Sequence, residues 1–492
     1  MMQFQGLSED NIRSIFSFCD ISTVLAVGMA NKYLHRLSVD KLVWVDLVDN
    51  LRRRGFIDLL SLSDIRSKSQ EELVGLVKAL LTGPASWNAA PAKSKLPFLA
   101  RFRSKRTSQP WQAHGQAEIS TEYILHPSSM DPSRMAEVKL LPGGKYILIR
   151  IRETLECWSM QGKKLIWVYE NSSPDSSATT TYIIGFSAEV LDGGDEANII
   201  VCEGLTFNAG AKSVVHILNL NFHTGISTTL FTNSYPFVCH QEPKICGNIA
   251  CLVWIADNPS SLPKRCCTCI LIDWQSMLHL QLADDLWHAR EPPTLAYPIR
   301  DHVILFAPIS SEALKIHLFN ITAFSRHWRP ITDASQSFPV VNISEVQSII
   351  SEPVTQFRDT WKPEFCVFES PLEKGTYRIC VYGWRPSSSV LLACSYHLSL
   401  PNGTRDAIFW RQRYSQTANF KYFGRVGIPY SGHILGCFRS NNHPGIFHPQ
   451  ADSSQGIEVP QSDSRRAFSH TSTYSGAMIY RERDAVVVTY FK

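Results

Sequence analysis

The chain has 492 residues, of which 44% are hydrophobic and 19% are charged, and its mean hydropathy is close to zero. At roughly 100–200 residues per domain this length allows two to four units, although a large β fold can hold more in one. The formal net charge of +4 and the pI near 8.3 are small for this size, so they do not indicate a general nucleic-acid-binding protein.

The first residues, "MMQFQGLSEDNIRSIFSF", have no basic region followed by an apolar run and no small-residue cleavage site, so we expect no secretory signal. No apolar run reaches the roughly 18 residues that a membrane-spanning helix needs. The sequence therefore predicts a cytoplasmic or nuclear protein with no membrane association. Thirteen scattered cysteines favour reduced core residues over a disulfide framework.

Residues 1–83 predict a helical region. Ser8 is placed to cap a first helix, with Glu9 and Asp10 in its first turn and apolar residues at helical spacing behind them. A second helix is expected within residues 20–37, where apolar residues fall on more than one face, and a third from about Val39.

The segment "SQEELVGLVKALLTGP" predicts a further helix over residues 69–81. Ser69 and Glu72 have the spacing of a capping box, and Gly83-Pro84 is expected to end the helix. We expect residues 51–83 to extend the first helical unit.

Residues 84–134 predict a basic linker. No carboxylate occurs from Leu73 to Ala117, while six basic residues accumulate: Lys93, Lys95, Arg101, Arg103, Lys105 and Arg106. A solvated connector is the first interpretation. A nuclear-import or nucleic-acid patch is the alternative, because four aromatic residues interleave with the charge and could stack on bases: Trp87, Phe98, Phe102 and Trp111.

From about residue 135 to the end, helical periodicity gives way to short runs of Val, Ile, Leu, Tyr and Trp between Pro, Gly, Asn, Asp and Ser. The order of turn, strand, hairpin and strand in residues 141–170 recurs loosely every roughly 40–55 residues, a period within the range of propeller blades. We therefore predict a β-propeller of six or seven blades over residues 135–492, with a pair of β-sandwiches as the alternative. Residues 119–125 are expected to pair with the closing strands within residues 474–492.

With the helices placed, residues 7–47, "LSEDNIRSIFSFCDISTVLAVGMANKYLHRLSVDKLVWVDL", resemble an F-box. The resemblance rests on a Leu-led first helix, an Asp at the turn, the segment "NKYLHRL" and a Trp in a third helix. It departs from the family pattern at Ser8, Asn31 and Leu34. A three-helix F-box at residues 1–50 followed by a divergent propeller is similar to a domain arrangement of fungal F-box proteins.

The resemblance implies a substrate receptor of a Skp1–cullin–F-box ubiquitin ligase. It places eight residues at, beneath or at the rim of the interface with a Skp1-like adaptor: Leu7, Ser8, Ile12, Ile15, Phe16, Leu25, Lys32 and Trp44. Physical reasoning points the same way, because a unit of about 45 residues buries too small a fraction of its surface to be stable on its own. The alternative is that these residues only pack against helices within residues 56–83.

No motif for catalysis or phosphate binding occurs in the sequence. Seven Cys and His residues cluster within residues 239–269, and we favour buried strand cysteines there, with zinc as the alternative: Cys239, His240, Cys246, Cys251, Cys266, Cys267 and Cys269. The scattered histidines and the acidic pairs Asp284/Asp285 and Glu482/Asp484 carry no catalytic signature.

We therefore predict a non-catalytic adaptor without a cofactor, which binds a Skp1-like protein at one end, and through it a cullin, and an unknown substrate protein at the other. Two alternatives remain. The propeller could be an enzyme or a small-ligand binder, or the chain could be a scaffold unrelated to ubiquitination whose basic segment touches nucleic acid.

Overall fold

The computed structural model describes most of the chain. The described residues are 6–88, 112–127, 137–151, 153–170, 180–207, 210–237, 239, 242–257, 265–283, 295–310, 313–331, 340–354, 357, 361–385, 390–400, 409–419, 422–438, 444–447, 455–460, 467–482 and 484–492. None of the described helices is long and apolar enough to cross a membrane.

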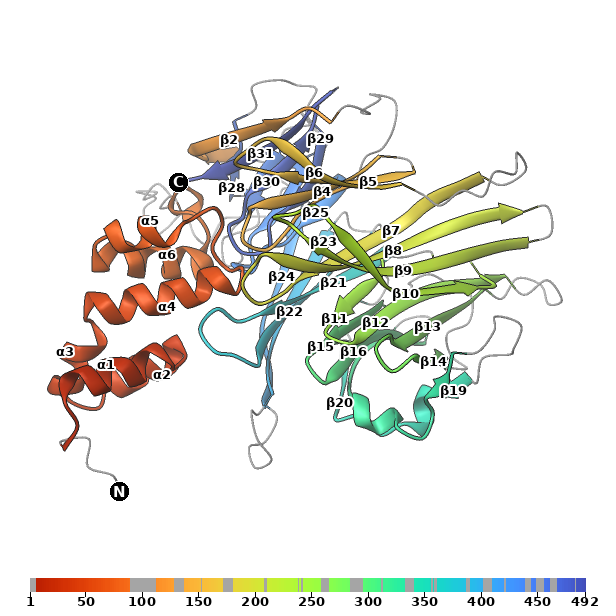
Figure 1. The fold of residues 1–492 in the computed structure, drawn as a ribbon, viewed down its shortest axis with the longest axis horizontal. Coiled ribbons are helices and arrows are strands. Elements are labelled where there is room, and N and C mark those ends of the chain that lie inside the picture. The colour runs from red at the N-terminus through yellow and green to blue at the C-terminus, as the bar shows by residue number, and fades with distance from the viewer. Residues whose placement is uncertain are drawn as a thin grey trace, which may run out of the picture.

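The N-terminal part is a helical bundle that lies beside a large β domain (Figure 1). Its helices are α1 (Glu9–Ser17), α2 (Ile21–Gly28), α3 (Lys32–Ser38), α4 (Lys41–Arg53), α5 (Leu62–Ser67) and α6 (Gln70–Thr82), followed by the 3₁₀ helix η2 (Ala85–Asn88). The first helix begins as predicted, because Ser8 caps it and accepts a hydrogen bond from the backbone N–H of Asn11 at 3.2 Å.

The single helix predicted within residues 20–37 is wrong, since the chain forms two helices there. Asn31 caps α3 by accepting a hydrogen bond from the N–H of Leu34 at 2.8 Å, which starts a new helix after a break at residues 29–31. The break lets α2 and α3 pack closely, because a Cβ added at Gly28 would lie only 2.4 Å from the Ser38 hydroxyl. The region predicted as a three-helix unit therefore holds four helices up to Arg53.

The predicted capping box at the start of α6 is confirmed. Ser69 accepts from the N–H of Glu72, and the Glu72 carboxylate accepts from the N–H of Ser69 at 2.6 Å. The hydrogen bond that the backbone N–H of Ser69 donates stabilises the charged carboxylate and lowers the pKa of Glu72. The helix ends at Gly83, whose φ of +77° suits glycine.

The β domain is a seven-bladed propeller, which confirms the upper value of the predicted blade count. In chain order the blades are β3 (Glu137–Leu140), β4 (Tyr146–Ile151), β5 (Thr154–Ser159), β6 (Lys164–Glu170); β7 (Thr180–Val190), β8 (Glu196–Phe207), β9 (Gly210–Asn221), β10 (Ser227–Tyr235); β11 (Lys244–Cys246), β12 (Ile249–Asp257), β13 (Arg265–Asp273), β14 (Leu278–Ala283); β15 (Leu295–Ile299), β16 (His302–Ser310), β17 (Ala313–Asn320), β20 (Ile350–Val354); β21 (Trp361–Glu369), β22 (Thr376–Arg385), β23 (Val390–Ser399), β24 (Phe409–Asn419); β25 (Tyr422–Gly427), β26 (Ile434–Phe438), β27 (Pro444–Phe447), β28 (Gln455–Glu458); and β29 (Ala467–Thr471), β30 (Met478–Arg481), β31 (Val486–Phe491), β2 (Ile119–Leu125).

Seven hydrophobic cores lie between neighbouring blades, and they close the ring. Alternate residues of one strand serve two cores: Val303 and Leu305 of β16 pack toward blade 3, whereas Ile304 and Phe306 pack toward blade 5. One of the seven cores joins blade 7 to blade 1. Because a sandwich pair has no such closed series of interfaces, that alternative is wrong.

The chain closes its ring with a strand from before the first blade, as predicted. β2 pairs antiparallel with β31, from Ile119 opposite Phe491 to Leu125 opposite Val486. Two further additions were not predicted: β1 (Gln112–Gln116) pairs parallel with β28, and β18 (Arg329–Pro330) and β19 (Val340–Asn342) extend β14. The predicted linker thus supplies two propeller strands, while its basic residues from Lys93 to Arg106 lie outside the described residues.

Candidate docking surface on the N-terminal helices

Large apolar side chains are exposed in unusual number on the first four helices. Eight of the sixteen that are exposed in the described part of the chain lie between Leu7 and Leu42. We call these eight the apolar helix surface: Leu7, Ile15, Phe18, Leu25, Met29, Tyr33, Val39 and Leu42. Phe18 at 89% and Met29 at 82% are almost fully exposed. Met29 is the C-cap of α2 and follows Leu25 by four residues, so the two side chains lie on the same side of the helix end. Such a concentration is typical of a surface that a partner covers.

The residues predicted for adaptor binding divide into two groups. Leu7, Ile15 and Leu25 belong to the apolar helix surface, and Ser8 and Lys32 are exposed beside it. The remaining three are buried in the helical core, together with residues of α5 and α6: Ile12, Phe16 and Trp44. Burial of these three fits both a position beneath an interface and the alternative of packing against residues 56–83.

The indole of Trp44 fixes the turn between α3 and α4. Its N–H donates to the carbonyl of Ser38 at 3.0 Å, within a buried environment. The sequence did not identify Phe18, Met29, Tyr33, Val39 or Leu42 as surface residues, because their apolar character is equally typical of a core. The prediction would have placed Met29 at the surface only if Asn31 had been recognised as a helix cap, which marks the break between α2 and α3.

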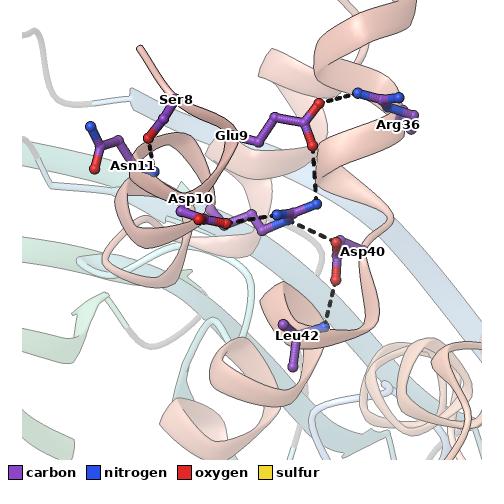
Figure 2. A network of polar contacts seen from close by, with 8 residues as sticks. Ser8, Glu9, Asp10, Asn11, Arg36, Asp40 and Leu42 are labelled. Atoms are coloured by element: carbon purple, nitrogen blue, oxygen red, sulfur yellow. Dashed lines mark hydrogen bonds and ion pairs between the residues drawn. The ribbon is translucent and has the colours of Figure 1, made fainter.

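A charged network locks α1 against the following helices (Figure 2). The Arg13 guanidinium contacts three carboxylates, with N···O distances of 2.8 Å to Asp40, 2.9 Å to Asp10 and 3.3 Å to Glu9. Arg36 also pairs with Glu9. Asp40 has a second role, since it caps α4 by accepting from the N–H of Leu42 at 2.9 Å. The network therefore holds the start of α4, where Leu42 is exposed, against α1. It also places charged groups next to the apolar helix surface.

The helical bundle is mounted directly on the propeller. The segment after α4 pairs with the β3–β4 turn, where the N–H of Gly143 donates to the carbonyl of Gly55 at 2.8 Å and the N–H of Leu59 donates to the carbonyl of Gly143 at 2.9 Å. Arg54 pairs with Glu369 of blade 5 at 2.8 Å. Phe56 packs edge-on against Tyr474 of blade 7, with ring centroids 4.6 Å apart.

Further contacts come from both ends of the bundle. The N–H of Ser22 in α2 donates to the carbonyl of Leu372, which lies in the turn between β21 and β22. At the other end Trp87 is buried against blades 6 and 7, which is incompatible with its predicted use in base stacking. The turns contacted in blades 1, 5 and 7 all join the first strand of a blade to its second, so they lie on one face of the propeller. We call this the mounted face.

Asp58 is a half-buried carboxylate at this junction. It accepts hydrogen bonds from the hydroxyls of Ser475 at 2.6 Å and of Ser472 and Tyr490 at 3.4 Å each. Burial disfavours the charged form and raises the pKa of Asp58 to about 6, although the three hydroxyls oppose the shift. The helices and the propeller thus share a polar contact that depends on the protonation of one group.

The inner strands carry a second charged cluster that crosses the ring. Lys139 of β3 and Lys244 of β11 both approach one oxygen of Glu242, at 2.7 and 2.6 Å, although blades 1 and 3 are not neighbours. Burial would raise the pKa of Glu242, but the two lysines more than offset it and the pKa is lowered. Nearby, burial lowers the pKa of His470 in β29 to about 4, so its imidazole is neutral at pH 7. Glu242 and the two lysines form ion pairs with one another, which fits a structural role in joining blades 1 and 3.

The described ranges hold no cluster of side chains suited to a metal ion. No three His, Cys, Asp or Glu side chains converge there as metal ligands. Cys239, Cys251 and Cys269 are buried thiols, as favoured from the sequence, whereas Cys246 is only half-buried. His433 is buried beside Ser431 and Trp87, and Glu482 lies in a turn. Six other members of these predicted sets lie outside the described residues: His240, Asp284, Asp285, His288, His443 and His448.

No protein-family model matches the chain, and no curated protein matches it. Solved structures resemble its fold at low similarity. An oligogalacturonate lyase in complex with manganese is 9% identical with a TM-score of 0.39, covering 77% of this chain and 98% of that one. The WD40 domain of SCAP from fission yeast is 9% identical with a TM-score of 0.38, covering 78% and 94%. Drosophila Semaphorin 1b is 8% identical with a TM-score of 0.31, covering 77% and 87%. Similarity this low says nothing about activity or partners.

Proposed function

We propose that this protein is a non-catalytic substrate receptor whose N-terminal helices bind a Skp1-like adaptor, and through it a cullin, while the propeller binds the protein to be ubiquitinated. The observation that carries the proposal is the apolar helix surface, which concentrates half of the exposed large apolar side chains described in the chain within residues 7–42. The resemblance of residues 7–47 to an F-box supplies the identity of the partner.

The arrangement of the surface fits such a partner. Ile12, Phe16 and Trp44 are buried in the core beneath the helices, and the residues of the apolar helix surface are not part of that core. Covering Phe18, Met29 and Leu42 would remove from water the most exposed of these side chains, at about 25 cal/mol for each Å² of apolar area. Lys32 is exposed next to Tyr33 in the chain and would lie at the rim of the interface.

Direct mounting of the bundle gives the proposal a mechanism. Because the helices contact the mounted face, the adaptor and the propeller are held in one orientation and not at the ends of a flexible tether. The target would bind on the opposite face, where the helices leave room. The chain would then supply proximity and orientation, which raise the effective concentration of target lysines at the ubiquitin-conjugating enzyme.

Co-expression with a Skp1-type adaptor tests the proposal. The test variant is Leu7→Asp with Ile15→Asp, and a second variant is Phe18→Asp with Met29→Asp; both replace exposed residues and should fold. The matched control is Ile349→Asp, since Ile349 is similarly exposed at 43% but lies on the propeller. We expect the wild type and the control to co-elute with the adaptor in gel filtration and the two test variants not to do so. Failure of the wild type to bind would refute the proposal.

A further inference from the structure

The outer edges of several blades are extended by strands from elsewhere in the chain. The last strand of blade 3 is extended by β18 and β19, that of blade 6 by β1, and the third strand of blade 7 by β2. These additions run parallel in two cases and antiparallel in two. The outer edges of this propeller therefore accept a further strand in either direction.

In four blades the outer strand comes from the blade's own stretch of chain and no described strand is added to it, and three of these four strands carry residues that discourage pairing. β6 has Lys164 and Glu170, β20 has Glu352 and Pro353, and β24 has Arg411 and Arg413. Charges and proline on an edge strand are the usual protection against pairing with another chain. The fourth outer strand, β10 of blade 2, has neither.

β10 is an uncharged edge with exposed apolar groups. Its sequence from Ile226 is "ISTTLFTNSY", and Ile226 and Leu230 expose 64% and 42% of their surface. Thr228, Thr229 and Thr232 are also exposed. Leu230 lies at a bulge against β9, which leaves it without a partner residue on that strand. The longer regular stretch of the edge is Phe231–Tyr235.

We propose that β10 is a self-association site, at which two copies of the chain pair their β10 edges antiparallel about a two-fold axis. Such a contact must be complementary to itself, and a strand without charges places no like charges opposite one another in any antiparallel register. Threonine pairs and threonine–leucine pairs across the axis are favourable cross-strand neighbours. An extended strand is also the kind of partner that the other outer edges already bind.

The pairing is independent of the function proposed above and compatible with it. The helical bundle contacts blades 1, 5, 6 and 7, so a dimer through blade 2 leaves the apolar helix surface accessible on both copies. Pairing of two nine-residue strands should bury less surface area than the roughly 1,000 Å² of a stable interface. We therefore expect a dissociation constant in the micromolar range.

Sedimentation of the full chain tests the proposal. Between about 1 and 100 µM, a range that brackets a micromolar dissociation constant, the weight-average mass of the wild type should rise from 55.5 kDa toward twice that value. Leu230→Lys with Thr232→Lys should weaken association at least about tenfold, by placing like charges on both edges. The matched control is Val168→Lys on β6, where the exposed fraction is 36%; it should associate as the wild type does.

Amide exchange gives a readout that needs no variant. Exchange of residues 226–235 in the wild type should slow as the protein concentration rises, and that of β6 should not. A wild type that stays monomeric at 100 µM overturns the proposal. Association that survives both β10 lysines, or that the β6 control weakens equally, assigns the contact to another surface and overturns it too.

Discussion

Asp58→Asn removes a negative charge from the junction between the helices and the propeller, where that charge lowers the stability of the folded state. The folded-state pKa of Asp58 is about 6, against 3.8 for the free side chain. Because the pKa is raised, the unfolded chain ionises more readily than the folded one, and the folded state loses stability as pH rises from about 4 to about 6. The shift of about two units corresponds to about 3 kcal/mol at pH 7.5.

The asparagine variant isolates this effect because its amide does not titrate. Its carbonyl can still accept from Ser475, the closest of the three hydroxyls at 2.6 Å. We expect the free energy of unfolding of the variant, relative to wild type, to increase by about 2 kcal/mol between pH 4.5 and pH 7.5. Urea denaturation at the two pH values, followed by tryptophan fluorescence, measures this difference.

Asp58→Asn must be compared with the wild type at the same pH, because His470 changes the stability of both proteins with pH in the opposite direction. Its folded-state pKa of about 4 lies below the free value of 6.5, so the folded state loses stability as pH falls through that window. The two contributions partly cancel in the wild type. If the difference between Asp58→Asn and wild type does not change with pH, or decreases, the burial of Asp58 does not penalise its charge and the reasoning is wrong.

Three other substitutions test separate parts of the structure. His470→Asn should retain more of its stability than the wild type when pH falls from 6.5 to 4, seen as a smaller loss in urea midpoint. Glu242→Gln leaves Lys139 and Lys244 facing each other and should cost about 1–2 kcal/mol, between the values for exposed and buried pairs, with recovery in high salt. Ser69→Ala removes a helix cap and should cost about 1 kcal/mol, whereas Ser63→Ala, inside the first turn of α5, should change the urea midpoint much less.

Local signals in the sequence predicted most of the elements, but not the break between α2 and α3, and they did not predict the surfaces. Ser8 and the Ser69–Glu72 pair predicted helix starts because capping depends on neighbours three residues apart. The propeller followed from the repeat, and the closing strand from the need to cover an edge. Only three of the eight residues of the apolar helix surface were predicted, because Met29 and Leu42 have the same apolar character as Val24 and Val43, which are buried. Tertiary packing alone separates them.

The mounting of the helices was not predictable, since several of its contacts join residues more than 300 positions apart. Arg54 pairs with Glu369, and Tyr474 donates from its hydroxyl to the carbonyl of the same Glu369 at 3.0 Å. Leu372 and Tyr474, both propeller residues, pack against the core of the helices. Because the two parts share this core, they should unfold together.

Phe56→Ala tests whether the helices and the propeller are one cooperative unit. Phe56 is 2% exposed and lies between the Arg54 guanidinium and the Tyr474 ring, so its removal leaves a cavity at the junction and should cost about 3–5 kcal/mol. Scanning calorimetry of the wild type should show one transition, and the variant should show two, with the helices melting first. Val74→Ala, which changes a helical residue away from the propeller contacts, should lower the single transition without splitting it. Two transitions in the wild type would mean that the junction is too weak to orient an adaptor relative to the propeller.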